Sequence, residues 1–296
     1  MGQLAERPGR LGIGIVGAGK VGAVLGAALR AAGHGVVGVA AVSQESKDRA
    51  ESLLPGIPIL KIPELVERSE LVLLAVPDDA LAQLVQGLAQ TGAWQMGQLV
   101  AHTSGRFGVG VLAPVRAAGA IPLAIHPAMT FSGLSMDLAR LPDSSFGVTA
   151  DAAMLPIAQA LVVEMGAEPV VIAEADRPLY HAALAHSANH LVTLVAQSAE
   201  LLEKIGVQQP DRILGPLLRA SLENALASGE NALTGPVARG DSGTVQAHVQ
   251  ALAESSEEIL LAYRAMAKST AIRAVSRARL SAAQAATIDR ALEGEL

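Results

Sequence analysis

The sequence predicts an α/β protein, in which a doubly wound parallel sheet is followed by an all-α C-terminal domain. In the first half of the chain, short and continuously apolar runs alternate with amphipathic stretches of helical length. Continuous apolar runs are typical of parallel strands, because these strands are buried on both faces of the sheet. After Glu174 the chain shows helical patterns and no further strand pattern, so a second domain made of helices is predicted.

The predicted elements follow from the period of the apolar residues and from the Gly, Pro and polar residues between the runs. Strand-like runs lie at 11–16, 35–42, 57–60, 70–76, 98–102, 120–126, 145–149 and 169–172. Helices are predicted at 20–32, 44–54, 78–90, 152–165, 176–205, 210–228, 244–272 and 281–293. In the helix 176–205, Asp176 is the expected N-cap, Pro178 lies in the first turn and Gly206 follows the last residue. We therefore place the domain boundary between 1–173 and 174–296.

Composition argues against several classes of function. The chain of 296 residues has a formal net charge of −6 and no dense run of Lys and Arg, so nucleic acid is not an expected partner. It contains no Cys, which excludes disulfides, thiolate catalysis and metal sites ligated by Cys. The longest purely apolar run, 71–76, is far shorter than the ~20 residues of a membrane helix. Residues 1–10 lack the apolar stretch of a signal peptide, so we expect a cytoplasmic protein without a membrane partner.

The segment Gly17-Ala18-Gly19-Lys20-Val21-Gly22 has the spacing G-x-G-x-x-G, between a predicted strand and a predicted helix at the start of the chain. In this context the spacing is typical of the Rossmann fold. The first glycine permits the turn, the second lets the backbone approach a pyrophosphate, and the third allows close packing of helix on strand. The helix N-terminus then donates N–H groups to the phosphate. We predict that these six residues bind NAD or NADP; the alternative is a Gly-rich turn without a ligand.

The end of the second predicted strand favours NADP over NAD. An enzyme that binds NAD usually carries Asp or Glu there to hold the ribose hydroxyls, whereas residues 41–44 read Ala-Val-Ser-Gln. Ser43, Gln44 and Lys47 are therefore predicted to hold a 2′-phosphate, because an anion needs donors and not a carboxylate. Two observations argue the other way: Glu45 follows closely, and Lys47 is also consistent with a solvated helix residue.

Three later segments place unusual residues at the ends of predicted strands: Val76-Pro77-Asp78, His102-Thr103-Ser104-Gly105 and His126-Pro127. Ligands of open α/β sheets lie at the carboxyl ends of the strands, so a nicotinamide pocket is expected here. The residues expected to contact the cofactor are Val76, Pro77, Thr103 and Ser104. The alternative is that the hydroxyls cap the next element and that each His satisfies a local carbonyl.

The predicted helix 176–205 carries a polar stripe made of His186, Asn189 and Thr193, at positions i, i+3 and i+7. Polar groups that face inward need partners, which a substrate or an interhelical hydrogen-bond network supplies. His186 and His190 have the spacing of zinc-protease ligands, but Ser187 stands where the required Glu would be. We therefore predict no metal site.

The segment 233–241, Leu-Thr-Gly-Pro-Val-Ala-Arg-Gly-Asp, interrupts the helical pattern with two glycines and a proline. Such an interruption places Arg239 and Asp241 on a constrained turn. Arg239 could bind a substrate carboxylate through paired hydrogen bonds, or it could pair with Asp241 at the surface.

Together these motifs resemble a bacterial family of two-domain proteins that join a Rossmann-like half to a helical half of unknown function. The resemblance covers nearly the whole chain; its specific marks are 17–22, 75–78, 102–105, 126–127 and 233–241. That family is similar to ketopantoate reductase, pyrroline-5-carboxylate reductase and the β-hydroxyacid dehydrogenases. The resemblance implies hydride transfer between NADP and a small oxo- or imino-acid, and a homodimer formed through the helical domains. In one respect the chain differs: β-hydroxyacid dehydrogenases carry a catalytic Lys three residues before an Asn, and here His186 precedes Asn189.

These observations predict an NADP-dependent oxidoreductase acting on a small carboxylate substrate. His186 is the predicted general acid, Asn189 would orient the substrate oxygen, and Arg239, aided by Ser104, would hold the carboxylate. His126 is the second candidate for the acid, because it lies at a strand end beside the expected nicotinamide. Two alternatives stay open: a non-catalytic NADP-binding sensor or scaffold, and a deazaflavin coenzyme as the hydride partner.

Overall fold

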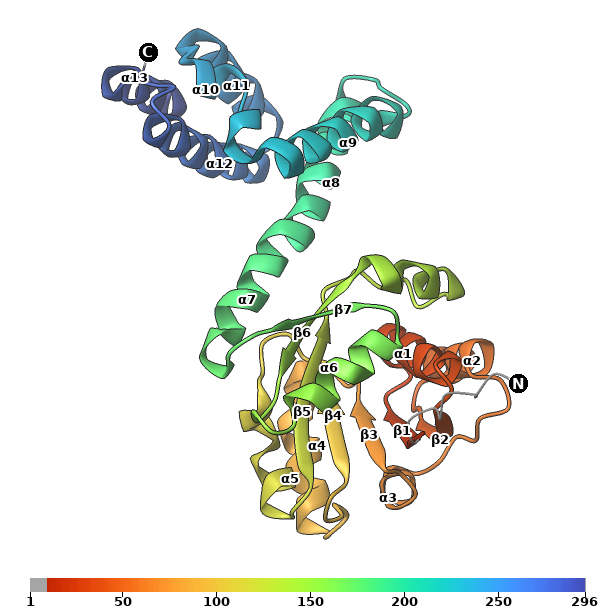
Figure 1. Ribbon diagram of the computed structural model, residues 1–296. Coiled ribbons are helices and arrows are strands. Elements are labelled where there is room, and N and C mark those ends of the chain that lie inside the picture. Colours follow the sequence, from red (N-terminus) through yellow and green to blue (C-terminus); the bar gives the residue numbers. More distant parts are fainter. Residues whose placement is uncertain (1–9, 296) are drawn as a thin grey trace, which may run out of the picture. The chain divides into compact units, whose positions relative to one another are not determined.

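The computed structural model describes residues 10–295, which form two compact units, the first ending at Ala188 and the second beginning at Asn189 (Figure 1). The prediction that residues 1–10 form no signal peptide concerns mainly residues 1–9, which lie outside the described residues. A sheet covered by helices forms the first unit, and helices form the second. The fold class predicted from the sequence is confirmed. The division of the chain falls within the segment predicted as the helix 176–205.

The first unit is built on a seven-stranded sheet in the order β2-β1-β3-β4-β5-β6-β7. Its strands are β1 (Gly12–Val16), β2 (Gly35–Ala40), β3 (Leu71–Leu74), β4 (Leu99–His102), β5 (Ile121–Pro127), β6 (Ser145–Thr149) and β7 (Glu168–Val171). All neighbouring pairs are parallel except β5 and β6, which are antiparallel. The apolar run 57–60 forms no strand and contributes a single bridge between Val39 and Ile59. The strand order reverses between β1 and β3, so the expected ligand crevice lies at their carboxyl ends.

Helices cover both faces of this sheet (Figure 1). One face carries α1 (Lys20–Ala31), α2 (Gln44–Leu53) and α6 (Leu155–Glu164); the other carries α3 (Ile62–Glu67), α4 (Asp78–Gln90) and α5 (Ala113–Ala117). Successive side chains of a strand point to opposite faces. Leu73 therefore packs in the core beneath α1 and α6, whereas Val72 and Leu74 pack beneath α3 and α4. Trp94, the only Trp of the chain, is buried in this second core, and its Nε1–H donates to the carbonyl of Val85 at 3.3 Å.

The segment predicted as one long helix is helical but not uniformly α. It consists of α7 (Arg177–Leu184), a π-helical turn (Ala185–Asn189) and α8 (His190–Lys204). The π turn shifts the helix register, which the apolar period of the sequence does not reveal. Asp176 occupies the N-cap position of α7, but its side chain makes no capping hydrogen bond. Gly206, with φ of +92°, follows α8 as expected.

In the second unit, α8 is followed by α9 (Pro210–Ser228), α10 (Pro236–Arg239), α11 (Ser242–Ser255), α12 (Glu257–Ser276) and α13 (Ala282–Glu293). The prediction of a single helix at 244–272 is wrong. Ser256 has an extended backbone and its hydroxyl accepts from the N–H of Ile259, so it ends α11 and caps α12. Small side chains such as Ala267, Ala271 and Ala291 are buried in the core of this unit, which allows its helices to pack closely.

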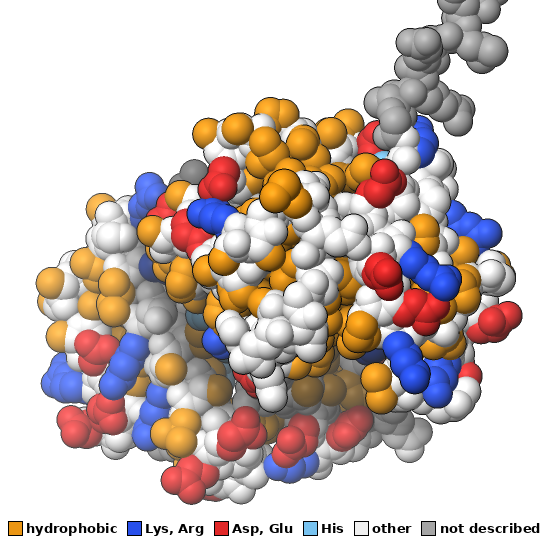
Figure 2. Space-filling view, turned by 90° about the horizontal axis from the view of Figure 1, so that it is seen from below, with side chains coloured by type: hydrophobic (Ala, Val, Ile, Leu, Met, Phe, Trp, Pro, Cys, Tyr) orange, Lys and Arg blue, Asp and Glu red, His pale blue; other side chains and the backbone are white. Residues whose placement is uncertain are grey.

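Acidic and basic side chains are interspersed on the face of the molecule drawn in Figure 2, and hydrophobic side chains gather between them. Among the described residues, no helix is both long and apolar enough to span a membrane.

Candidate active site

Two glycines of the β1–α1 turn are required by the packing of the protein itself. Gly17 has φ of +99°, and a Cβ there would lie 2.4 Å from the carbonyl oxygen of Ala75. A Cβ on Gly22 would lie 2.0 Å from the carbonyl oxygen of Gly17 and 2.8 Å from the Cβ of Ala75. Both distances are far below van der Waals contact, so the turn, the first residue after β3 and the start of α1 fit together only without side chains at these positions.

Gly19 differs from the other two glycines, because a Cβ at this position would have no atom within 4 Å. It is the N-cap residue of α1, where no side chain caps the helix and no acidic residue lies in the first turn. Its φ of −66° and ψ of −173° are open to any residue. The N–H groups of an uncapped helix N-terminus and the positive end of its dipole attract an anion. The open space over Gly19 therefore suits the close approach of a phosphate to the backbone.

The other residues of the turn divide between core and surface: Ala18 is buried, Val21 is half-buried and Lys20 is exposed. Next to the turn, Val76 lies against Gly17, since a Cβ built on Gly17 would be 3.4 Å from its Cγ1. Pro77 is the N-cap residue of α4.

At the end of β2, the residues predicted to hold a 2′-phosphate lie at the start of α2. The Ser43 hydroxyl caps this helix by accepting from the N–H of Ser46 at 3.2 Å. The Gln44 amide donates to Asp48 at 2.7 Å, and Lys47 is half-buried. The carboxylate of Glu45, which argued against NADP, forms an ion pair with Arg49 at 2.5 Å.

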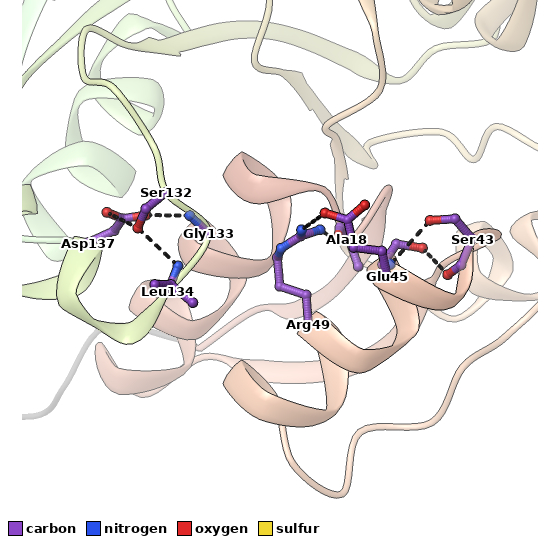
Figure 3. Close-up of polar contacts among 9 residues, drawn as sticks. Ala18, Ser43, Glu45, Arg49, Ser132, Gly133, Leu134 and Asp137 are labelled. Atoms are coloured by element: carbon purple, nitrogen blue, oxygen red, sulfur yellow. Dashed lines mark hydrogen bonds and ion pairs between the residues drawn. The ribbon is translucent and has the colours of Figure 1, made fainter.

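Arg49 lies at the nucleotide turn, although the motifs of the sequence did not indicate it. Its Nη1 donates to the carbonyl oxygen of Ala18 at 3.2 Å, and its Nη2 pairs with Glu45 (Figure 3). Its side chain is only 13% exposed. The only hint in the sequence is a Glu–Arg pair spaced i, i+4 on the helix after the second strand. The guanidinium brings a positive charge to the segment between the first two glycines.

The loop after β5 approaches the same turn. Gly133 has φ of +83°, and a Cβ there would lie 2.7 Å from Nε of Arg49 and 3.0 Å from Cγ of Lys20. Asp137 shapes the loop: its buried carboxylate accepts from the Ser132 hydroxyl at 2.9 Å and from the Gly133 N–H at 2.8 Å (Figure 3). Burial alone would raise the pKa of Asp137, but these hydrogen bonds outweigh it and lower the pKa. Asp137 thus stays ionised and fixes the loop that packs beside Arg49 and Lys20.

At the end of β4, the polar residues bind the loop that follows. His102 is fully buried; its Nδ1 accepts from the N–H of Ser104 at 3.1 Å, so its Nε2 donates to the carbonyl of Gly108 at 2.8 Å. Burial lowers the pKa of His102 to about 4, against the opposing effect of the Gly108 hydrogen bond. The Ser104 hydroxyl accepts from the N–H of Phe107 at 3.3 Å, and the Thr103 N–H donates to Leu74 at 3.2 Å.

His126, in β5, belongs to a cluster of rings. Its Nδ1 lies 2.9 Å from the hydroxyl of Tyr180, and its ring meets the rings of Tyr180 and His181 edge to face at 5.6 Å and 5.9 Å between centroids. A Cβ on Gly105 would lie 2.5 Å from Cδ2 of His181 and 2.9 Å from Nε2 of His126. The pKa of His126 is lowered to about 4 by burial and by the positive charge of Arg177. This His is therefore neutral at pH 7.

Arg177 is fully buried beside this cluster. Its Nε donates to the Thr149 hydroxyl at 2.8 Å, and its Nη2 donates to the carbonyls of Gly147 at 3.0 Å and Ala124 at 3.1 Å. A longer bond of 3.4 Å joins Nη1 to the carbonyl of Ser104. Within residues 10–295, no carboxylate lies within 4.0 Å of the guanidinium. Arg177 is a buried cation held by neutral acceptors, and burial lowers its pKa.

Sequence reasoning missed Arg177, Tyr180 and His181, which occupy positions i, i+3 and i+4 and share one face of α7. This face contacts β5, β6 and the loop after β4 through side-chain hydrogen bonds to His126, Ala124, Gly147 and Ser104. The sequence signal that could have revealed this cluster was the basic, the aromatic and the His residue on one turn of a predicted helix.

His126 is the predicted catalytic residue that belongs to this cluster. The other three come from later segments of the chain. His186 is exposed in the π turn at the end of the first unit, whereas Asn189 and Arg239 are exposed residues of the second unit. Asp241 caps α11, accepting from the N–H of Thr244 at 3.1 Å, and no ion pair within 4.0 Å joins it to Arg239. The grouping of these residues around one substrate stays a prediction. In the part of the chain that the structure describes, no group of His, Asp and Glu side chains is arranged to hold a metal ion.

Comparison with solved structures shows the same fold in proteins described as oxidoreductases and reductases. A proposed NADP oxidoreductase from Bacteroides fragilis has a TM-score of 0.75 at 22% identity, over 88% of this chain and 98% of that one. A pyrroline-5-carboxylate reductase from Streptococcus pyogenes has 0.60 at 20% identity, over 96% and 99%. The Plasmodium falciparum pyrroline carboxylate reductase with NADP bound has 0.59 at 11% identity, over 95% and 100%.

Comparison with protein families divides the chain into two segments. Residues 3–127 match the Rossmann-like domain, and residues 144–270 match DUF2520, a domain of unknown function. No curated protein matches the chain. The chain therefore joins a Rossmann-like domain to a DUF2520 domain, which confirms the family that the sequence motifs indicate.

Proposed function

We propose that this protein is an oxidoreductase that binds NADP at the β1–α1 turn and transfers hydride to or from a small oxo- or imino-acid. One observation carries the proposal: the packing of the protein explains Gly17 and Gly22, whereas nothing in it explains Gly19. The space over Gly19 lies at an uncapped helix N-terminus, which suits the pyrophosphate of a dinucleotide. The NADP bound to the Plasmodium falciparum reductase of the same fold supports this reading.

The substitution Gly19→Ala is expected to leave the fold intact and to weaken NADPH binding by at least about tenfold, because its methyl group would occupy the space that the phosphate needs. NADPH fluorescence titration measures the affinity, and urea unfolding measures the stability. Gly87→Ala in α4 is the matched control, since a Cβ there also meets no atom within 4 Å. It should leave NADPH binding unchanged and stabilise the helix by roughly 0.5–1 kcal/mol. Equal NADPH affinity of Gly19→Ala and wild type would remove the nucleotide from this turn.

NADP is favoured over NAD because two basic residues, Lys47 and Arg49, lie on the helix that follows β2, where the 2′-phosphate is expected. Arg49 donates a hydrogen bond to the carbonyl of Ala18, between the first two glycines. It also pairs with Glu45, so the carboxylate nearest to the end of β2 already has a basic partner. Ser43 and Lys47 lie on the same helix start. A phosphate binds well to such a set of donors, whereas ribose hydroxyls need a carboxylate acceptor.

Replacing Arg49 with glutamine is expected to weaken NADPH binding by about 10- to 100-fold, which corresponds to one lost hydrogen bond to a charged group. The affinity for NADH should change by less than about threefold. The measurement is a parallel titration of wild type and Arg49→Gln with both nucleotides. Arg68→Gln is the control, because Arg68 forms the same i, i+4 ion pair, with Glu64 at 2.7 Å, away from the turn. An equal loss for both nucleotides would show that Arg49 acts on the fold and not on the phosphate.

For the reaction itself, the arrangement supports His126 as the proton donor, since this neutral His lies at the carboxyl end of β5 in a polar cluster. His186, the acid predicted from the sequence, is the alternative to His126. Asn189 as orienting residue and Arg239 as the holder of the substrate carboxylate keep their predicted roles within the proposal. Turnover of a panel of small 2-oxo acids and cyclic imino acids by His126→Gln and His186→Ala separates the two acids. NADPH that binds tightly and is never oxidised would instead favour the sensor or scaffold.

We also propose that the protein is a homodimer through its helical unit. Exposed large apolar side chains occur along α8, α9 and α12, among them Val192, Leu226 and Ile272. Apolar faces of this extent in a helical unit are typical of subunit interfaces. A single-chain mass in light scattering would contradict the proposal.

A further inference from the structure

We propose that Tyr180 supplies the proton of this reaction through His126, and that the buried guanidinium of Arg177 balances the charge that Tyr180 then carries. The inference rests on the proposed function, because it requires a substrate oxygen or nitrogen that takes up a proton when the adjacent carbon receives hydride. It adds two residues of α7 to the chemistry of the site.

The relay depends on the direction of the Tyr180–His126 hydrogen bond. The two groups are 2.9 Å apart, and a neutral imidazole that accepts at Nδ1 carries its proton on Nε2. A phenol is protonated at neutral pH, and burial raises the pKa of Tyr180 further, so the hydroxyl has a proton to donate. The relay assigns the hydrogen bond the direction from the Tyr180 hydroxyl to Nδ1. Nε2 of His126 lies beside the backbone of Gly105, where a Cβ would be only 2.9 Å from it. With this direction, Nε2 is the nitrogen of His126 that carries the proton in the relay.

The relay also requires a counter-charge. A buried cation is normally paired with a carboxylate, but Arg177 is held by the carbonyls of Ala124, Gly147 and Ser104 and by the hydroxyl of Thr149. Its guanidinium carbon lies 5.8 Å from the ring centroid of Tyr180. At rest this positive charge is hydrogen-bonded only to neutral acceptors, and the carboxylate that acts on it, Glu174, lies beyond 4.0 Å. An anion formed on Tyr180 would therefore appear beside a cation that forms no close ion pair. Such a preformed charge stabilises a developing anion without rearrangement of the site.

The proposed step moves two protons in the same direction. The substrate atom takes the proton from Nε2 of His126, while Nδ1 takes the proton of the Tyr180 hydroxyl. The N–H bond at Nε2 and the O–H bond of Tyr180 break, and a new bond to the substrate and an N–H bond at Nδ1 form. The hydride, with its electron pair, comes from NADPH in the proposed function. Water returns a proton to Nε2, and Nδ1 gives its proton back to the Tyr180 phenolate.

A second Tyr–His pair in the chain provides a matched control. Tyr263, the only other Tyr, lies 3.0 Å from Nδ1 of His248, with ring centroids 5.8 Å apart and ring planes at 82°. It belongs to the second unit, and burial alone raises its pKa. The relay therefore predicts different results for Tyr180→Phe and Tyr263→Phe, although both remove one hydroxyl from a Tyr–His contact.

The first test is the turnover of NADPH with the panel of 2-oxo and cyclic imino acids. Tyr180→Phe is expected to lower kcat by about 100- to 10,000-fold, the usual range for a lost proton transfer, with KM changed by less than about threefold. Tyr263→Phe should keep kcat within about twofold of wild type. A Tyr180→Phe protein with the kcat of wild type would overturn the relay, as would an equal loss in both variants.

The second test needs no turnover. Nitrogen NMR of the His side chains, assigned with His126→Gln, reports which ring nitrogen of His126 carries the proton. We expect the Nε2–H form in wild type and Tyr263→Phe, and a shift toward the Nδ1–H form in Tyr180→Phe. The groups that face His126 are Arg177, Tyr180 and His181 from α7 and His102 from β4, so the spectra are compared at one pH. An Nδ1–H form in wild type overturns the relay, whereas NADPH that binds without any oxidation overturns the proposed function.

Discussion

Replacing Arg177 with alanine is expected to lower the free energy of unfolding by about 3–5 kcal/mol. The substitution removes the donor from the Thr149 hydroxyl and from the carbonyls of Ala124 and Gly147, and a buried acceptor left without a donor costs about 1–3 kcal/mol. It also leaves a cavity where β5 and β6 face α7. Release of the guanidinium from its buried site offsets part of this loss. Urea unfolding followed by Trp fluorescence measures the change, because Trp94 lies in the same unit.

The control for this prediction is Arg116→Ala. Arg116 is 52% exposed and pairs with Asp151 at 2.9 Å, so its removal should cost no more than about 1 kcal/mol. Equal stability losses in the two variants would contradict the assignment of Arg177 as the link between α7 and the sheet.

Acidification is expected to destabilise the protein between about pH 6.5 and pH 4, chiefly through His102. In the unfolded chain this His takes up a proton near its ordinary pKa of about 6.5, whereas burial lowers its pKa to about 4 in the folded protein. Between these values the unfolded state binds the additional proton, so stability present above pH 6.5 is lost as the pH falls. A shift of this size corresponds to about 3 kcal/mol at the acid limit. The half-buried His126, whose pKa is also lowered to about 4, adds to the same trend.

Urea unfolding at several values between pH 7.5 and pH 4.5 tests this expectation. His102→Gln should be less stable than wild type at pH 7.5, since it loses the bonds to Gly108 and Ser104. Its stability should fall less steeply with acid, because one of the two His residues whose pKa is lowered to about 4 is gone. His248→Gln, at an exposed position, should follow the wild-type curve. A His102→Gln protein with the wild-type dependence on pH would assign the acid sensitivity to other groups.

The features that the sequence predicted well are those encoded in neighbouring residues. The helix 78–90 and the strand 145–149 have the predicted bounds, since an apolar run or an amphipathic period marks each of them directly. The β1–α1 turn was recognisable because three glycines within six residues carry it. The break at Ser256 was missed, because the helical period continues on both sides of a single capping residue.

The candidate site was predicted only in part, because several of its contacts join distant parts of the chain. Arg177 in α7 is held by backbone carbonyls, which have no signature in the sequence. The nearest of these carbonyls belongs to Gly147 in β6. Tyr180 contacts His126, and Arg49 contacts Ala18. Both pairs are far apart in the sequence, so only the folded structure reveals the contacts. The prediction instead followed the polar stripe of His186 and Asn189, which assumed an α-helical period where the structure has a π turn.

The burial of Trp94 decides what an optical experiment can observe in this protein. It is the only Trp, and it lies between α4 and the sheet of the first unit, so Trp emission reports on that unit alone. The second unit contributes most of its signal as helical circular dichroism. Circular dichroism follows the helices of both units, whereas Trp emission follows the first unit alone. Coincident unfolding curves from the two methods would therefore mean that the units melt together. Energy transfer from Trp94 to a bound reduced nicotinamide would likewise report binding without any engineered label.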